Sequence, residues 1–78
     1  MENDYTSMDI YLTSTLLVLG YKFTGWEKDS LGKVTFKIKN DSSIKQTIED
    51  YWEGKLELNP LNLWKEFKFL KSVIYDTR

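Results

Sequence analysis

The sequence predicts an α+β fold in which three helices pack on one face of a small antiparallel sheet. Residues 33–39 alternate apolar and polar side chains, which is the pattern of a half-buried strand. Apolar residues recur every three or four positions along 8–19 and again along 60–74, as they do on one side of a helix. Glycine and other turn residues separate these segments. The expected order is therefore helix, strand, strand, helix, short strand, helix.

The first helix is expected over residues 8–19. Thr6 and Ser7 precede it, and a hydroxyl in this position can accept a hydrogen bond from an unpaired N–H group of the first turn. Gly20 allows the left-handed conformation in which many helices end. The expected core face consists of Met8, Tyr11, Leu12, Thr15, Leu16 and Leu19. Further apolar residues lie off this face, so the helix is either central in the core or has a partner on its second side.

A β-hairpin is expected from residues 21–28 and 33–39, because the intervening Asp-Ser-Leu-Gly segment has the residue types of a tight turn. The second strand directs Val34, Phe36 and Ile38 towards the core. The same alternation in the first strand places Phe23 on the inner face. It places Lys22, Thr24, Trp26 and Lys28 on the outer face, with Gly25 at a position that tolerates a bulge.

The second helix is expected to start after Asn40 and Asp41, with Ser43 and Gln46 at the spacing of a capping box, and to end at Gly54. Residues 55–58 alternate briefly and predict a short third strand. Asparagine followed by proline then starts the last helix, because asparagine caps and proline suits the first helical position. The expected core stripe of that helix is Leu63, Trp64, Phe67, Leu70 and Ile74.

Composition indicates one small domain. The 78 residues predict a single domain over 1–78 with an ordered core from about 6 to 75. The sequence has no Cys and no His, so disulfides and the usual zinc sites are excluded as sources of stability. Its three Trp, five Tyr and four Phe must supply much of the core. A net charge of -1, no positively charged leader and no long apolar run predict a cytoplasmic protein without membrane contact.

The chain resembles an uncharacterised family of short bacterial and phage proteins. The resemblance rests on residues 7–12 leading to Leu19-Gly20-Tyr21, on the hairpin, and on residues 50–56, 59–60 and 70–75. It covers roughly residues 6–75 and implies a bacterial, phage or mobile-element source and a free-standing small domain. It carries over no catalytic residue.

No catalytic, cofactor-binding or metal-binding residues are expected, because neither His nor Cys is present and no phosphate-binding loop occurs. We therefore expect a non-enzymatic interaction module that binds protein, either another copy or a different chain, with no small-molecule substrate. Apolar residues outside the helix core stripes are the candidate interface: Leu17, Val18, Phe69 and Val73. Tyr51, Trp52, Trp64 and Phe67 are expected in the core, but any of them left exposed becomes an interface candidate.

Two alternatives remain open. The outer sheet face could bind nucleic acid or an acidic partner, with lysines holding phosphates while an exposed ring stacks on a base. The candidate residues are Lys22, Trp26, Lys33, Lys37 and Lys39. A solvated face that discourages sheet-to-sheet aggregation explains the same lysines. The family resemblance adds a phage-type inhibitor that binds a host protein.

Overall fold

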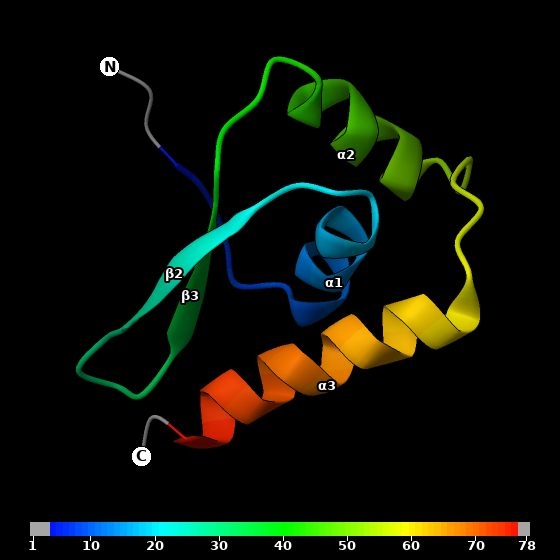
Figure 1. Cartoon of the computed structure of the whole chain (residues 1–78). Helices are drawn as coiled ribbons and strands as arrows, with labels where there is room; N and C mark the ends of the chain where they lie inside the picture. Colours follow the sequence, from blue (N-terminus) through cyan, green and yellow to red (C-terminus); the bar gives the residue numbers. More distant parts are fainter. Residues whose placement is uncertain (1–3, 77–78) are drawn as a thin grey trace.

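The computed structural model describes residues 4–76 and has three helices and a three-stranded antiparallel sheet (Figure 1). The elements are β1 (Tyr5–Ser7), α1 (Ile10–Val18), β2 (Phe23–Lys28), β3 (Val34–Ile38), α2 (Ile44–Trp52) and α3 (Pro60–Asp76). The α+β class and the central hairpin are confirmed. The predicted order is wrong in two places, because the strand β1 precedes α1 and no strand separates α2 from α3.

The sheet has the strand order β1-β3-β2, with every pair antiparallel. In the register of the first pair, Tyr5 lies opposite Ile38 and Ser7 opposite Phe36. The expected third strand at residues 55–58 is wrong, because that segment is irregular and residues 5–7 occupy the free edge of β3 instead. A strand of three residues is too short for its alternation to be recognised in a sequence.

The start of α1 also differs from the prediction. Asp9 occupies the N-cap, and its Oδ1 accepts hydrogen bonds from the N–H groups of Tyr11 at 2.9 Å and Leu12 at 3.1 Å. Ser7 lies two residues earlier, where its Oγ accepts a hydrogen bond from the N–H of Asp9 at 3.1 Å. The carboxylate therefore satisfies two of the unpaired donors of the first turn, and residues 6 and 7 are free to pair with β3.

The stability of this cap is testable. Asp9→Ala should lower the free energy of unfolding by about 1 kcal/mol, because two backbone donors lose their acceptor. Thr6→Val removes one of the two hydroxyls expected from the sequence at the helix start, keeps the branched shape, and should change stability by less than about 0.5 kcal/mol. Urea denaturation followed by circular dichroism measures both. Equal losses in the two variants would contradict the assignment of the cap to Asp9.

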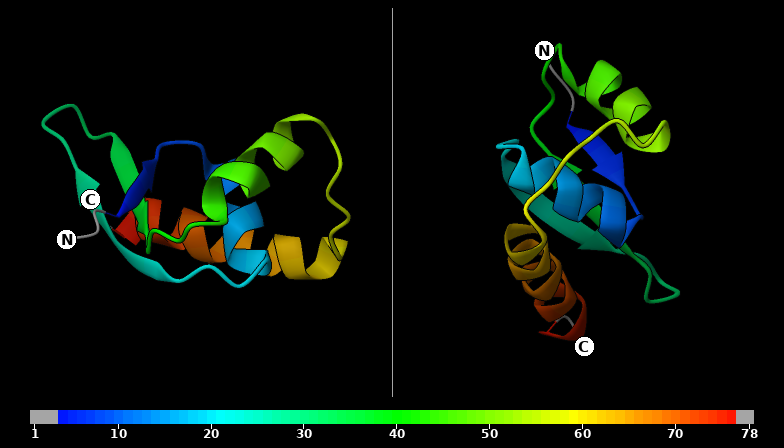
Figure 2. Two further views of the ribbon diagram at one scale, coloured as in Figure 1. Left: turned by 90° about the horizontal axis from the view of Figure 1, so that it is seen from above. Right: turned by 90° about the vertical axis from the view of Figure 1, so that its right-hand side faces the viewer.

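The helices gather on the sheet face that carries Phe36 and Ile38 (Figures 1 and 2). In Figure 1, α1 lies between α2 above it and α3 below it, and it contacts both. The main core cluster joins α1, β3 and α2 through Leu12, Leu16, Ile38 and Ile44. Phe36 and Leu70 are also buried. The molecule is flat, measuring 35 × 34 × 18 Å, so a large share of each helix lies near the surface.

Three hydroxyl residues of α1 are buried: Thr13, Ser14 and Thr15. Each hydroxyl donates to the backbone carbonyl four residues earlier, at distances of 2.8, 2.7 and 3.0 Å respectively. Because the helix itself supplies these partners, burial leaves none of the hydroxyls unsatisfied. The buried side of α1 thus differs from the expected apolar face, of which three members are exposed: Met8, Tyr11 and Leu19.

Candidate functional site

Two hollows flank the connection between α2 and α3, and Leu56 of that connection lines both. The first, here named the polar hollow, has polar and apolar lining in about equal measure and lies beside the start of α2. The second is largely apolar and lies between α1 and the start of α3. The two hollows use different residue types, so each suggests a different chemistry.

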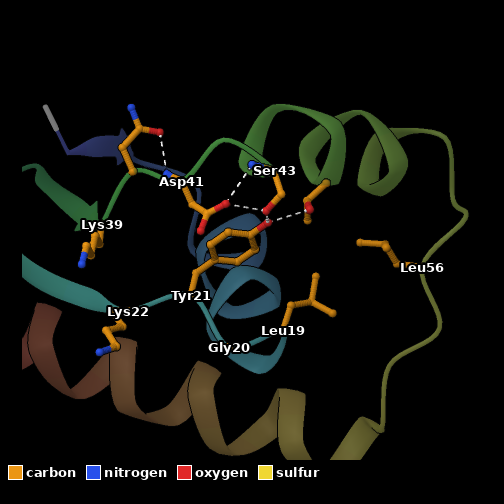
Figure 3. Close-up of a pocket in the computed structure, with 10 residues that line it drawn as sticks. Leu19, Gly20, Tyr21, Lys22, Lys39, Asp41, Ser43 and Leu56 are labelled. Carbon is orange, nitrogen blue, oxygen red and sulfur yellow. Dashed lines mark hydrogen bonds between the residues drawn. The ribbon is translucent and has the colours of Figure 1, made fainter. Parts of the chain in front are cut away.

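The polar hollow has a volume of about 530 Å³ (Figure 3). Its lining is Leu19, Gly20, Tyr21, Lys22, Lys39, Asn40, Asp41, Ser43, Thr47 and Leu56. The hydroxyl of Tyr21 forms hydrogen bonds with Ser43 Oγ at 2.6 Å and Thr47 Oγ1 at 2.8 Å. These bonds tie the start of the hairpin to the first turn of α2, so the hydroxyls of this hollow serve the packing of the chain.

The predicted capping box of α2 is wrong. Ser43 occupies the N-cap, but its side chain bonds to Tyr21 and to Asp41 Oδ1 and does not cap the helix. Gln46 donates to Asp50 within the helix. The backbone N–H of Ser43, followed by its hydroxyl, lowers the pKa of Asp41 below its ordinary value of 3.8. Asp41 therefore places a carboxylate at the polar hollow, whose lining also contains Lys22 and Lys39.

The second hollow, here named the aromatic groove, has a volume of about 660 Å³. The connection and the start of α3 form one side, and α1 with the end of α2 forms the other. Its lining is Tyr11, Ser14, Thr15, Tyr51, Gly54, Leu56, Leu58, Pro60, Leu63, Trp64 and Phe67. The hydroxyls of Ser14 and Thr15 already donate to carbonyls of α1, so the groove offers mainly rings and aliphatic side chains.

A stack of three rings runs along the aromatic groove. Phe67 lies between Tyr11 and Trp64, with ring centroids 5.3 and 5.9 Å away and interplanar angles of 18° and 20°. Lys71 places its Nζ 5.6 Å from the centroid of the Phe67 ring. The outer rings remain accessible, since Tyr11 is 63% exposed and Trp64 55% exposed. The stack therefore presents a wide aromatic surface in which each ring packs against its neighbour.

Two of the four aromatics expected in the core are exposed. Trp52 is 66% exposed and meets Tyr51 edge to face at 4.9 Å, and Trp64 faces the groove. Tyr51 is half-buried, and desolvation, with Asp9 nearby, raises the pKa of its hydroxyl. Both tryptophans were predicted as core because they recur at helical spacing with other apolar residues of their helices. In the fold, α3 buries Leu70, and this orientation turns Trp64 outward.

The four interface residues predicted from the sequence are less exposed than Tyr11 and Trp64 of the stack. Leu17 packs against the core cluster, and Val18 and Val73 are half-buried. Phe69 is 45% exposed, but its ring meets Phe23 edge to face at 5.3 Å. None of these four residues lines the aromatic groove. The lining includes residues that the sequence did not single out for binding, among them Tyr11, Leu58 and Pro60. Their sequence pattern does not differ from that of residues that only pack within the fold.

A β-bulge separates Trp26 from the lysines with which it was predicted to share the outer sheet face. Between Phe23 and Gly25 the register of β2 shifts, so that Trp26 lies opposite Phe36 and Gly25 opposite Lys37. Residues opposite each other in a ladder share a face, so Trp26 lies on the side of Phe36 and away from Lys37, contrary to the prediction. Gly25 has a φ of 151°, a conformation that glycine adopts readily.

The lysines themselves remain at the surface. Lys37 forms an ion pair with Glu27, which lies in the neighbouring strand. The other three candidate lysines are exposed: Lys22, Lys33 and Lys39. Of these, Lys22 and Lys39 line the polar hollow. The candidate nucleic-acid face thus lacks its aromatic member and has one lysine neutralised locally.

Within residues 4–76 there is neither a cluster of metal ligands nor a helix suited to span a membrane. Within this part of the chain, no three acidic side chains gather in a way that could hold a metal ion. No helix of the same part has both the length and the apolar character needed to cross a bilayer.

Comparison of the chain with models of protein families found no match, and neither curated proteins nor solved structures gave one.

Proposed function

We propose that this protein is a small non-enzymatic interaction module that associates with a second copy of itself through the aromatic groove. The observation that carries the proposal is the stack of Tyr11, Phe67 and Trp64, which lines an apolar hollow and leaves its outer rings exposed. Trp and Tyr are the residues most enriched among the energetic centres of protein interfaces. The groove therefore has the composition of an interface core.

The packing of the rings favours a protein partner. Stacked neighbours restrict the side chains before binding, so less conformational entropy is lost when a partner covers them. Association also suits a domain of 78 residues, because a chain this short buries a limited share of its own apolar surface and gains stability from a partner.

The alternatives receive less support from the geometry. Nucleic-acid binding by the outer sheet face would need a ring beside the lysines, and Trp26 lies on the other face. Enzymatic activity would need an activated group in a hollow, whereas the hydroxyls of Ser14 and Thr15 are engaged by their own helix. The phage-type inhibitor remains a proposal that rests on the family resemblance alone.

Sedimentation equilibrium over about 1 µM to about 1 mM protein tests self-association, since this range covers dissociation constants of weak to moderate interfaces. We expect the weight-average mass to rise with concentration from the 9.3 kDa of one chain towards twice that value. A mass that stays at one chain throughout would refute the proposal. If such a monomer bound a labelled single-stranded oligonucleotide with steep salt dependence, the nucleic-acid alternative would replace it.

A further inference from the structure

The polar hollow brings groups of both charges to one space (Figure 3). Its volume of about 530 Å³ suits a small-molecule ligand. Lys22 and Lys39 come from the open end of the hairpin, and Asp41 comes from the segment that leads into α2. The charge and the hydrogen-bonding capacity of these groups indicate which kind of ligand the hollow can hold.

The hydroxyl protons of the polar hollow are all used within the chain. Ser43 Oγ donates to Asp41 Oδ1 at 2.7 Å, because an ionised carboxylate only accepts. Tyr21 therefore donates its single hydroxyl proton to Ser43 at 2.6 Å and accepts one from Thr47 at 2.8 Å. This chain of hydrogen bonds runs in one direction, from Thr47 to Asp41. The three hydroxyls can accept from a ligand, but they have no proton left to donate to it.

Asp41 adds an acceptor that carries charge. The backbone N–H of Ser43 donates to Oδ1 at 2.8 Å, and this bond, followed by the hydroxyl bond, lowers the pKa of the carboxyl; the charge of Lys39 acts in the same direction. Both bonds use Oδ1. Among residues 4–76, Oδ2 accepts no hydrogen bond, and it is directed away from Ser43 in Figure 3. This part of the hollow therefore favours a cationic group with N–H donors.

The two lysines supply the opposite charge. The N–H of Lys39 donates to the carbonyl of Lys22 at 2.8 Å, one position beyond the ladder of β2 and β3. Residues opposite each other project from the same face, where two like charges are unfavourable. Within residues 4–76 neither lysine forms an ion pair, and Asp4 accepts a hydrogen bond from Thr24. An anionic group would relieve the repulsion and accept hydrogen bonds from both ammonium groups.

We infer that the polar hollow binds a small zwitterion of the amino acid class, with its carboxylate at Lys22 and Lys39 and its ammonium group at Asp41. Leu19 and Leu56 lie on the other side of the Tyr21 ring from the lysines in Figure 3 and suit an aliphatic side chain. This binding is additional to self-association and does not depend on it.

Titration of the isotope-labelled protein with L-leucine, followed by amide NMR spectra, tests the site. We expect saturable shifts at Tyr21, Lys39 and Ser43 with a dissociation constant of about 1 mM, because a ligand of this size gains limited free energy. Leucinamide lacks the carboxylate and N-acetylleucine lacks the ammonium charge, so each should bind at least about tenfold more weakly. Absence of shifts up to about 50 mM leucine would refute the inference.

Two variants test the charged groups one at a time. Asp41→Asn keeps an acceptor oxygen for Ser43 but removes the negative charge, and Lys22→Gln with Lys39→Gln removes both cations. Each should weaken leucine binding about tenfold. The matched control, Lys33→Gln with Lys68→Gln, removes two lysines that do not line the polar hollow and should stay within about twofold of the wild type. Circular dichroism verifies that each variant is folded.

The outcomes separate a zwitterion from a simple anion. If N-acetylleucine binds as well as leucine and Asp41→Asn has no effect, the hollow takes only an anion at its lysines, and the inference is wrong. If leucinamide binds as well as leucine, the lysines take no part, and the inference is equally wrong. The mass of the wild type in sedimentation equilibrium bears on self-association alone, so the two proposals fail separately.

Discussion

Replacement of Leu16 by alanine is expected to lower the free energy of unfolding by about 2–5 kcal/mol. Leu16 is fully buried and belongs to the cluster that joins α1, β3 and α2. Alanine is a good helix former, so the loss reflects the cavity and not a weaker helix. A domain of this length has a total stability of roughly 4–12 kcal/mol, which means that the variant loses a large fraction of it. Urea denaturation followed by circular dichroism measures the change.

Leu31→Ala is the matched control, because it makes the same chemical change at a side chain that is 82% exposed in the hairpin turn. We expect its effect to stay within about 0.5 kcal/mol. Similar losses at the two positions would contradict the placement of the core between α1, β3 and α2.

Replacement of Trp64 by alanine is expected to weaken self-association by at least about thirtyfold, the change that corresponds to one interface residue of high energetic weight. Trp64 is one of the two outer rings of the stack and is open to a partner. A symmetric pair contains two copies of the residue, so the loss occurs twice in each dimer. Sedimentation equilibrium gives the dissociation constant.

Trp26→Ala provides the control for this second prediction. Trp26 is 42% exposed, close to the exposure of Trp64, but it lies on the sheet and does not line the aromatic groove. Its removal should change the dissociation constant by less than about threefold. If the two tryptophans contribute equally, the interface does not centre on the groove. If only Trp26 matters, the face of β2 carries the association instead.

Several element boundaries follow from local chemistry. The hairpin was predicted because alternation and a turn signal occur together, and β2 and β3 pair as expected. The start of α3 was predicted from asparagine and proline, and Asn59 Oδ1 accepts a hydrogen bond from the N–H of Leu61 at 2.9 Å. Gly20 and Gly54 end their helices with φ of 101° and 71°. Each of these features depends on residues close together in the chain.

The features that define the candidate site depend on distant residues. The stack joins Tyr11 to Phe67, and the hydroxyl network joins Tyr21 to Ser43 and Thr47. No spacing rule connects such positions, because their distance is set by how α1 packs against its neighbours. The sequence predicted Trp64 as core and as an interface candidate only if exposed. The fold leaves it exposed, and its role in binding stays a prediction.

The sequence by itself determined the α+β class, the three helices, the central hairpin and the caps at Gly20, Gly54 and Asn59, because propensity, periodicity and capping act within a few residues. Tertiary structure alone decided that residues 5–7 take the edge of β3 and that a bulge turns Trp26 away from Lys37. It also decided that α1, α2 and α3 leave an aromatic groove between them. These outcomes depend on pairing and packing between segments far apart in the chain. Such contacts contribute free energy only once the chain is folded.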